Sequence, residues 1–147
     1  MTTVRVLLQC LDPDLPGPSQ ANPGDAGWDL RARFDVTIPP GERRLVQTGV
    51  AIALPRGWVG LIHPRSGLAL RDGFTIANAP GTIDAGFRGE ISVIGLNTDI
   101  DNVCNLRRGD RIAQLIVQQV VNVVFDEVQE LPGSVRDAGG FGSSGRG

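Results

Sequence analysis

Residues 78–90 read Asn-Ala-Pro-Gly-Thr-Ile-Asp-Ala-Gly-Phe-Arg-Gly-Glu, with turn-forming residues on both sides of a short extended piece. The Pro-Gly pair bends the chain, and Gly86 is expected to permit a second turn that a side chain would hinder. The residues that follow alternate polar and apolar side chains, as a half-buried strand does. The segment therefore predicts a β-hairpin whose mouth carries one carboxylate, Asp84, and one aromatic ring, Phe87.

A hairpin of this kind has the groups needed for chemistry on a flat ligand. Its free backbone N–H and C=O groups can pair with a hydrogen-bonding ring, and Phe87 can pack on the side of that ligand. The Asp84 carboxylate can orient or deprotonate a water. The alternative is an ordinary turn in which Asp84 accepts hydrogen bonds from backbone amides. The rest of the chain has to decide between these interpretations.

The composition favours one domain of short strands and turns. Of 147 residues, 41% are hydrophobic but only 5% are aromatic, so Val, Ile and Leu must build the core. Twenty Gly and ten Pro indicate a sandwich or jelly roll. Residues 43–54 are predicted to form one long strand. Residues 120–128 contain five Val and predict a strand that needs cover on both faces, in the core or at a subunit interface.

Several kinds of site lack their residues. There is no Lys, so a phosphate-binding P-loop is excluded, and any phosphate must be held by Arg side chains and backbone amides. Cys10 and Cys104 match no metal-ligand spacing, which argues against a zinc site. His63 is the only His, and a Ser-His-Asp triad would require it.

Charge and hydropathy also limit the partners. The net charge of −2 gives no reason to expect nucleic acid or a membrane as a partner. The N-terminus lacks the apolar run of a signal peptide, and no segment is long enough to span a bilayer. We therefore expect a cytoplasmic protein.

Asp29 and Gln114 are polar residues within predicted strands. Asp29 is either a solvated strand residue or a carboxylate that holds hydrated Mg²⁺, which keeps several waters and takes few carboxylates. Gln114 lies on the polar face of a strand over 111–118 and matters only if a ligand lies above that face.

Residues 68–70 are the best candidates for a helix. Ser66 is placed to cap it and Gly73 to end it. The N–H groups at its start, beside Arg65 and the Ser66 hydroxyl, suit a phosphate. The alternative is a capped surface turn.

The composition changes sharply at residue 132. Residues 132–147 are rich in Gly and Ser and cannot bury a core, which predicts a flexible arm after a β domain over 1–131. Phe141 is a lone aromatic among glycines, and Arg136 and two Ser offer anion contacts. These features favour an arm that closes over a ligand; the alternative is a dispensable tail.

Taken together, five segments resemble, in order, the five motifs of the trimeric dUTPase (deoxyuridine triphosphate nucleotidohydrolase) family. Each segment alone is a weak signal, but five in the same order over nearly the whole chain are strong. They are residues 26–30, 64–69, 81–90, 109–115 and 136–145.

The resemblance implies a fold, an assembly and a reaction. The fold is all-β, a jelly-roll-like distorted barrel or sandwich with one short helix and a flexible Gly-rich C-terminal arm. The assembly is a homotrimer whose active sites lie between subunits. The reaction is hydrolysis of dUTP to dUMP and diphosphate with Mg²⁺, which supplies dUMP for thymidylate synthesis and keeps uracil out of DNA.

The resemblance also implies a role for individual residues. Asp84 would activate the water that attacks the α-phosphorus, and Asp29 would hold Mg²⁺ through water. Phe87 would pack against the deoxyribose. The other implied substrate contacts fall into three groups: Arg65, Ser66, Gly67 and Gln114 for the phosphates; Asn78, Gly81, Thr82, Ile83 and Asp84 for uracil; and Arg136, Phe141, Gly142, Ser143 and Ser144 for the closing arm.

Two positions depart from the family pattern. The family commonly has Tyr where this chain has Phe87, which puts sugar selectivity in question. The fifth motif commonly begins Arg-Gly, whereas here it is Arg136-Asp137, and the added negative charge would oppose closure over a triphosphate.

Two other functions are alternatives to dUTP hydrolysis. A dCTP deaminase shares the fold and resembles the segment around Arg65, but the Gly-rich fifth motif and the Asp84 segment favour dUTP hydrolysis. A catalytically silent trimer that binds nucleotide or protein would be marked by loss of Asp84, Arg65 or the arm, and all three are present.

Overall fold

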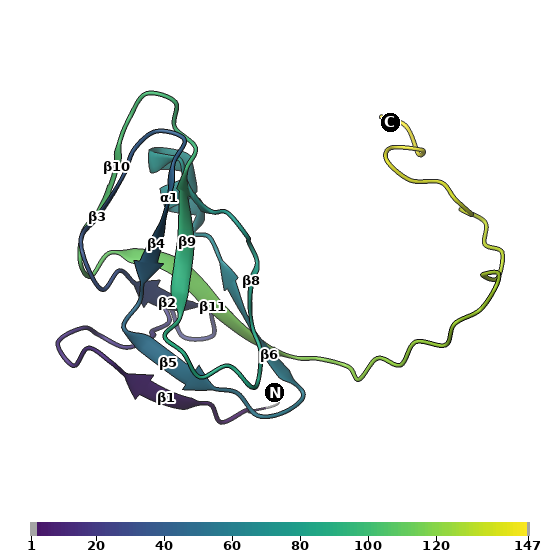
Figure 1. Cartoon of the computed structure of the whole chain (residues 1–147), viewed down its shortest axis with the longest axis horizontal. Helices are drawn as coiled ribbons and strands as arrows, with labels where there is room; N and C mark the ends of the chain where they lie inside the picture. The colour runs from purple at the N-terminus through teal and green to yellow at the C-terminus, as the bar shows by residue number, and fades with distance from the viewer. Residues whose placement is uncertain (1–2, 147) are drawn as a thin grey trace.

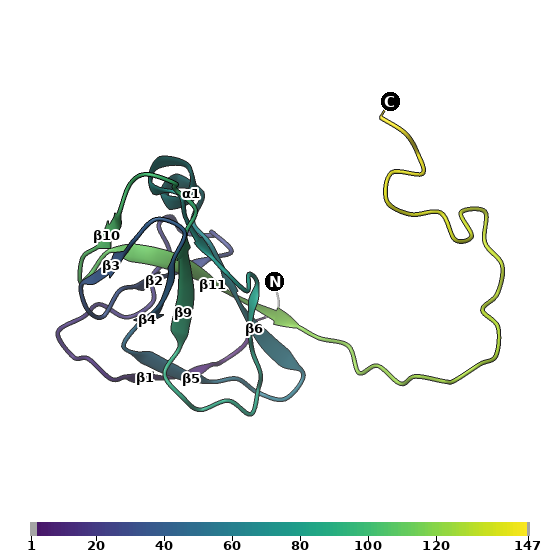
Figure 2. The same cartoon turned by 45° about the horizontal axis from the view of Figure 1, so that its top comes forward.

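The computed structural model describes residues 3–146, and within them the chain forms short strands and one short helix. Figures 1 and 2 show the strands gathered in one body, from which the C-terminal segment departs. In chain order the elements are β1 (Leu7–Cys10), β2 (Trp28–Arg31), β3 (Val36–Ile38), β4 (Arg43–Gln47), β5 (Val50–Ala53), β6 (Trp58–His63), α1 (Ser66–Asp72), β7 (Phe74–Ile76), β8 (Gly81–Ile83), β9 (Ser92–Asn97), β10 (Cys104–Leu106) and β11 (Arg111–Gln119).

The strands pair into small, open, antiparallel sheets. The largest has the order β2-β11-β6-β8, the next has the order β4-β9-β7, and β1-β5 and β10-β3 form two-stranded ribbons. This is the predicted jelly-roll-like arrangement, and the all-β prediction is confirmed.

Aliphatic side chains build the core between the sheets, as the low aromatic content requires. Phe74 is fully buried there, and a Cβ at Gly95 would lie only 2.5 Å from its ring. The absence of a side chain at Gly95 therefore leaves the space that the Phe74 ring occupies. The other apolar side chains with the lowest exposure are Leu30, Ile38, Val46, Ile91, Val93, Leu106 and Ile112.

The prediction of a single strand over residues 43–54 is wrong, because residues 48–49 interrupt it between β4 and β5. We call this interruption the β4–β5 break. Gly49 lies in the break with φ +74°, a conformation that side chains disfavour, and the two strands join different sheets. The Thr48 hydroxyl donates to the Ile91 carbonyl at 2.6 Å. The hydrophobic pattern continues through the break, so the pattern alone could not reveal it.

The predicted β-hairpin is also wrong. β8 pairs with β6, whereas β9 pairs with β4 and β7, so within residues 3–146 the segment 84–90 crosses between two sheets instead of joining paired strands. It contains a turn closed by the Phe87 N–H donating to the Asp84 carbonyl at 3.0 Å. A Cβ at Gly86 would meet nothing within 4 Å among the described residues, so the expected need for glycine there is not observed.

Helix α1 lies where a helix was predicted, but its cap differs. Arg65 is the N-cap residue and Ser66 is the first helical residue, so the prediction of Ser66 as the cap is wrong. Gly73 ends the helix with φ 63°, as predicted.

The segment after β11 leaves the body (Figure 1). Val121, Val124 and Phe125 are 83%, 76% and 92% exposed, and within the described chain residues 120–128 form no strand. A core strand there is therefore wrong, while a strand at a subunit interface and the domain boundary at 131–132 stay predictions. Within residues 3–146, no helix is both long and apolar enough to cross a membrane.

An ion-pair network ties the loop after β1 to the turn before β11. Arg108 donates to Asp12 Oδ1 at 3.0 Å, and the Arg33 Nε lies 3.5 Å from Asp12 Oδ2. The hydrogen bond from the Arg108 side chain is the main cause that lowers the pKa of Asp12 to about 2 from its usual 3.8.

The low pKa of Asp12 predicts a pH-dependent contribution to stability. Because the folded state binds this proton less tightly than the unfolded chain, the contribution is complete above pH 4 to 5 and is lost as the pH falls toward 2. We expect Asp12→Asn to lower the free energy of unfolding at pH 7, and the gap from the wild type to close near pH 2. Urea unfolding across this range measures it, with Asp126→Asn in the exposed segment as the control for loss of one charge. A gap that is independent of pH would contradict the assignment.

Candidate functional site

Asp29 and Gln114 are neighbours across two strands. Gln114 on β11 pairs with Asp29 on β2 and with His63 on β6, and cross-strand partners face the same side of a sheet. A Cβ at Gly27 would lie 2.3 Å from Gln114 Oε1, so the glycine leaves the space that the Gln114 amide fills. The two side chains are thus held together at one place on the largest sheet.

Asp29 is buried, at 5% exposure, and carries ion pairs on both carboxylate oxygens. Arg65 Nε lies 3.1 Å from Oδ1, and Arg111 NH1 lies 3.4 Å from Oδ2. A buried carboxylate requires such partners, because an unpaired one is costly. The solvated-strand alternative for Asp29 is therefore wrong, and the cluster of the three side chains has a net positive charge.

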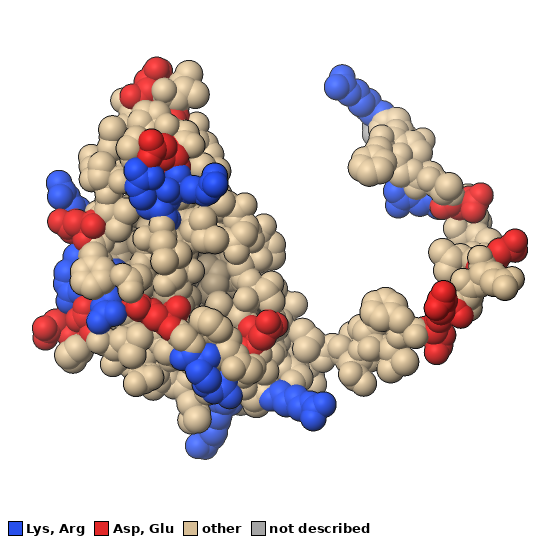
Figure 3. Space-filling view, viewed as in Figure 1, with Lys and Arg blue, Asp and Glu red and all other residues tan. Residues whose placement is uncertain are grey.

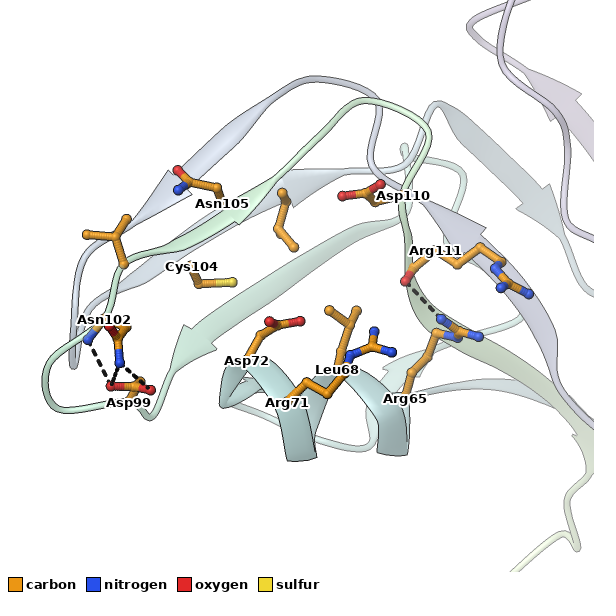
Figure 4. A pocket seen from close by; sticks show the side chains of 12 residues that line it. Arg65, Leu68, Arg71, Asp72, Asp99, Asn102, Cys104, Asn105, Asp110 and Arg111 are labelled. Carbon is orange, nitrogen blue, oxygen red and sulfur yellow. Dashed lines mark hydrogen bonds between the residues drawn. The ribbon is translucent and has the colours of Figure 1, made fainter.

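The guanidinium of Arg65 is fixed from two directions. Its Nε lies beside Asp29 as an ion pair without a hydrogen bond, and its NH1 donates to the Arg111 carbonyl at 3.2 Å, which Figure 4 shows. The β11 register shifts between Arg111 and Ala113, and this irregularity comes directly after the carbonyl that receives Arg65. Arg65 is thus held in one orientation at the start of α1.

Two hollows in the surface meet at Arg65. One, of about 280 Å³, has Asp29, Arg65, Gln114 and Gly27 in its wall. The other, of about 520 Å³, lies between α1 and the segment 99–106 and is lined by both Asp and Arg side chains (Figure 4). Ser66 and Gly67 are exposed in the first turn of α1 and directly follow Arg65 in the chain. The first hollow combines the Arg65 guanidinium and the Gln114 amide, two donors that suit a phosphate, with the carboxylates of Asp25 and Asp29.

A metal would find few protein ligands here. Within residues 3–146, no group of three or more His, Cys, Asp or Glu residues is close enough to hold a metal ion. Asp29 offers one carboxylate, and both of its oxygens face guanidinium groups. Since Mg²⁺ keeps several waters and takes few carboxylates, this residue fits an ion that arrives with its other ligands already on the substrate.

The residues expected to read the base lie at the other edge of the same sheet. Gly81, Thr82 and Ile83 form β8, the last strand in the order β2-β11-β6-β8. A Cβ at Gly81 would lie 3.6 Å from Asn78 Nδ2, so these two residues are adjacent. An edge strand leaves alternate backbone N–H and C=O groups free to pair with a ligand. Asp84 and Phe87 follow it, both exposed.

One chain does not bring Asp84 to Asp29. The registers place Ile83 level with Gly60 and Val117, so Asp84 lies about four residues along the strands from the row of Asp29 and Gln114. It also lies three strands across. With about 4.8 Å between strands and about 3.4 Å per residue, the separation is roughly 20 Å. A general base has to lie within hydrogen-bonding distance of the proton it removes.

The predicted arm residues lie away from both groups (Figures 1 and 2). Phe141 is fully exposed, and Arg136 Nε donates to the Gly139 carbonyl at 2.7 Å within the arm itself. Gly142, Ser143 and Ser144 are also in this departing segment. The predicted site residues therefore form three groups in space: one around Asp29, one around Asp84 and one in the arm.

Sequence reasoning missed Arg111 and Gly27. Both lie inside segments that carry the resemblance, yet Arg111 has no predicted role, and Gly27 is predicted only to keep the backbone slim, without a named partner. The available signal for Arg111 was indirect: Asp29 on a strand between apolar neighbours is a candidate for burial, and a buried carboxylate needs cations. Gly27 had no such signal, because its neighbour Gln114 is far away in the sequence.

Comparison with known proteins gives one answer throughout. The family model for dUTPase matches residues 14–145. The deoxyuridine 5'-triphosphate nucleotidohydrolase of Thermobifida fusca is 61% identical over 97% of this chain and 80% of its own length. That of Rhodococcus erythropolis is 60% identical over 97% of this chain and 87% of its own length.

Solved structures share the fold. A mutant dUTPase of Staphylococcus bacteriophage 80α with dUpNHpp superposes with a TM-score of 0.89, 26% identity, and coverage of 97% of this chain and 99% of its own. A mutant dUTPase of phage φ11, described with a structural Mg(II) ion, has a TM-score of 0.80 at 23% identity, with coverage of 88% and 100%. By sequence and by structure, the chain belongs to the dUTPase family and hydrolyses dUTP to dUMP.

Proposed function

We propose that this dUTPase works as a homotrimer in the cytoplasm, with each active site assembled from different copies of the chain. The observation that carries the proposal is the separation of roughly 20 Å between Asp84 and Asp29 in one chain, estimated from strand registers. The exposed apolar residues of the segment after β11 support it, since they have no cover within the described part of the chain. An arm leading away from its own body is suited to reach the site of another copy.

The group around Asp29 binds the triphosphate. Arg65, Ser66 and Gly67 donate to phosphate oxygens, and Gln114 adds an amide donor. Charge gathers on phosphoryl oxygens in the transition state, so donors that are fixed in advance stabilise it most. The two contacts that hold Arg65, from Asp29 and from the Arg111 carbonyl, provide that fixed orientation.

Asp84 from a second copy is the general base. It takes a proton from the water that attacks the α-phosphorus; the bond from the α-phosphorus to the bridging oxygen breaks, and diphosphate leaves with dUMP as the other product. Asp84 is exposed in one chain, so it is accessible to the water of a neighbouring phosphate group.

The edge of β8 recognises uracil. Backbone groups of Gly81, Thr82 and Ile83 pair with the base, and the Asn78 side chain beside Gly81 adds a contact. Phe87 packs against the deoxyribose and leaves no space for a 2′-hydroxyl. Arg136, Phe141, Gly142, Ser143 and Ser144 close over the nucleotide from the arm, excluding water from the phosphates.

Asp29 would hold Mg²⁺ through water when a nucleotide is bound. The ion would neutralise phosphate charge and polarise the phosphoryl oxygens. Arg65 keeps its Nε beside Asp29 Oδ1 while its guanidinium contacts a phosphate, and Arg111 pairs with Oδ2 of the same buried carboxylate.

Asp84→Asn tests the base. We expect a folded trimer that binds dUTP with kcat lower by roughly 10²- to 10⁴-fold, because the amide cannot accept the proton. Diphosphate release is measured with dUTP, dTTP, dCTP and UTP, alongside ammonia release from dCTP. Asp101→Asn, in an exposed loop, is the matched carboxylate control. Near-normal turnover by Asp84→Asn would mean that another group is the base.

Complementation tests the shared site. Chains with Asp84→Asn and chains truncated after Leu131 should each have little activity, the latter reduced on the order of 10²-fold or more because closure is lost. Co-expressed as mixed trimers, they should regain activity, because one chain supplies Asp84 and the other supplies the arm. Activity equal to the sum of the two separate variants would show that each chain works alone.

Metal titration tests the role of Asp29. The nucleotide-free protein should show no saturable Mg²⁺ binding at micromolar concentrations by calorimetry, because its one carboxylate already faces two guanidinium groups. With dUpNHpp present, one Mg²⁺ should bind per nucleotide, and more weakly in Asp29→Asn. Tight, stoichiometric binding without nucleotide would overturn this assignment.

A further inference from the structure

The turn that carries Asp84 and Phe87 is anchored at its far end by Glu90. Glu90 Oε1 accepts hydrogen bonds from the Gly49 N–H at 2.8 Å and from Arg33 NH1 at 3.1 Å, and Oε2 accepts one from Gln47 Nε2 at 2.8 Å. The Glu90 side chain is only 16% exposed. A carboxylate with three donors, one of them charged, is a strong and directional contact.

The partners of Glu90 lie in the break between β4 and β5. Because Gly49 has φ +74°, its N–H turns out of the strand and becomes free to donate to Glu90. The next residue of the turn enters the same break: the Ile91 N–H donates to the Val50 carbonyl at 2.8 Å, and its carbonyl accepts the Thr48 N–H at 3.2 Å. Residues 48–50 at the break thus provide hydrogen-bond partners for residues 90 and 91.

The interior of the turn has two further constraints. Arg88 NH1 donates to the Ala85 carbonyl at 2.6 Å and to the Phe87 carbonyl at 2.8 Å. A Cβ at Gly89 would lie 2.7 Å from the Phe87 ring, so only glycine leaves room for the ring in this orientation. These contacts are local to the turn, so its placement on the body depends on its two ends.

The two ends differ in kind. At the start, β8 is fixed by its ladder with β6. At the end, the segment 84–90 has no ladder within the described residues; the backbone of Ile91 bonds to Thr48 and Val50, and Glu90 adds the side-chain contacts that fix the last residue of the segment to the body. We propose that Glu90 is a positioning residue for catalysis and sugar selection: through the β4–β5 break it sets where Asp84 and Phe87 stand. This rests on the roles proposed above for those two residues.

Glu90→Gln isolates the contact. An amide carries no charge to pair with Arg33, and its NH₂ group faces Gln47 Nε2 unless the Gln47 amide turns to present its oxygen, so the three contacts of the carboxylate are not kept as they stand. A displacement near 1 Å of a catalytic group can cost on the order of 10²-fold. We expect kcat for dUTP to fall by about 10- to 100-fold, and the preference for dUTP over UTP to fall by about 10-fold, because both depend on the placement of the same turn.

Asp12→Asn is the matched control. It removes a different carboxylate from the same Arg33 network without touching the turn, so it should lower stability yet leave kcat and the dUTP/UTP ratio unchanged. Gln47→Met keeps the side-chain volume and removes one donor; it should give a smaller loss in kcat, about 3- to 10-fold. Should Glu90→Gln not fold, Gln47→Met against Asp12→Asn decides the question.

Amide hydrogen exchange gives a readout that does not depend on turnover. In Glu90→Gln, the amides of residues 84–91 should exchange faster, while those of β6 and β8 stay protected, and Asp12→Asn should leave residues 84–91 unchanged. Unchanged exchange and kcat in Glu90→Gln, or losses equal to those in Asp12→Asn, would overturn the proposal. If Asp84→Asn retains turnover, the base assignment fails, and the exchange result alone decides whether Glu90 anchors the turn.

Discussion

The buried carboxylate of Asp29 is the constraint around which this side of the molecule is arranged. An ionised group at 5% exposure must be paired, and its two partners come from separate elements: Arg65 precedes α1 and Arg111 begins β11. The ion pairs therefore join β2, the helix start and the irregular end of β11. The three side chains carry one net positive charge, and Arg65 and Asp29 line a hollow to which Gln114 adds an amide donor.

The geometry of a β-sheet then limits what one chain can do. Strand spacing and register place the Asp84 turn at the opposite edge and four rows away from Asp29, and no side chain is long enough to close roughly 20 Å. With the phosphate-binding group and the base that we propose on opposite edges, a complete site requires the association of two copies. The first residues beyond β11, uncharged and exposed beside the body in Figure 3, give such an association an apolar surface to cover.

Patterns that depend on local spacing were readable in the sequence. The all-β architecture followed from turn residues and short apolar runs, and Gly73 was recognisable as a helix end because its position relative to α1 is local. The break at Gly49 and the crossing of residues 84–90 between sheets were not readable. In both cases the deciding partner is distant in sequence. Ile91 and Glu90 form hydrogen bonds with residues of the β4–β5 break, and β8 pairs with β6 and not with β9. A pattern of alternating residues states which face is apolar but not which strand lies beside it.

The same distinction between local patterns and distant contacts applies to the residues of the site. The residue types for phosphate and base recognition could be named from motifs, whereas Arg111, Gly27 and Glu90 act through contacts that only the folded chain reveals. Asp29 illustrates the difference. Its residue type suggested a metal contact or a solvated position, while its burial between two guanidinium groups shows that it also fixes Arg65.

The two departures from the family pattern have a physical reading in the structure. Asp137 has φ 46°, in the left-handed region that glycine adopts freely and that Asp and Asn tolerate better than most other residues. Asp is therefore a conformationally acceptable replacement for Gly there, and its charge is the remaining difference.

Phe141 also has a positive φ, 48°, which is strained for a bulky side chain by about 1–3 kcal/mol. Its ring is fully exposed, so contacts on the ring do not compensate that strain, and a docked arm that relaxed this residue would gain free energy in addition to its new contacts.

The second departure is Phe87. Its ring fits over Gly89, and that fit depends on the shape of the ring and not on a hydroxyl. The sugar selection that we propose for Phe87 therefore rests on the packing of its ring and not on a hydroxyl group.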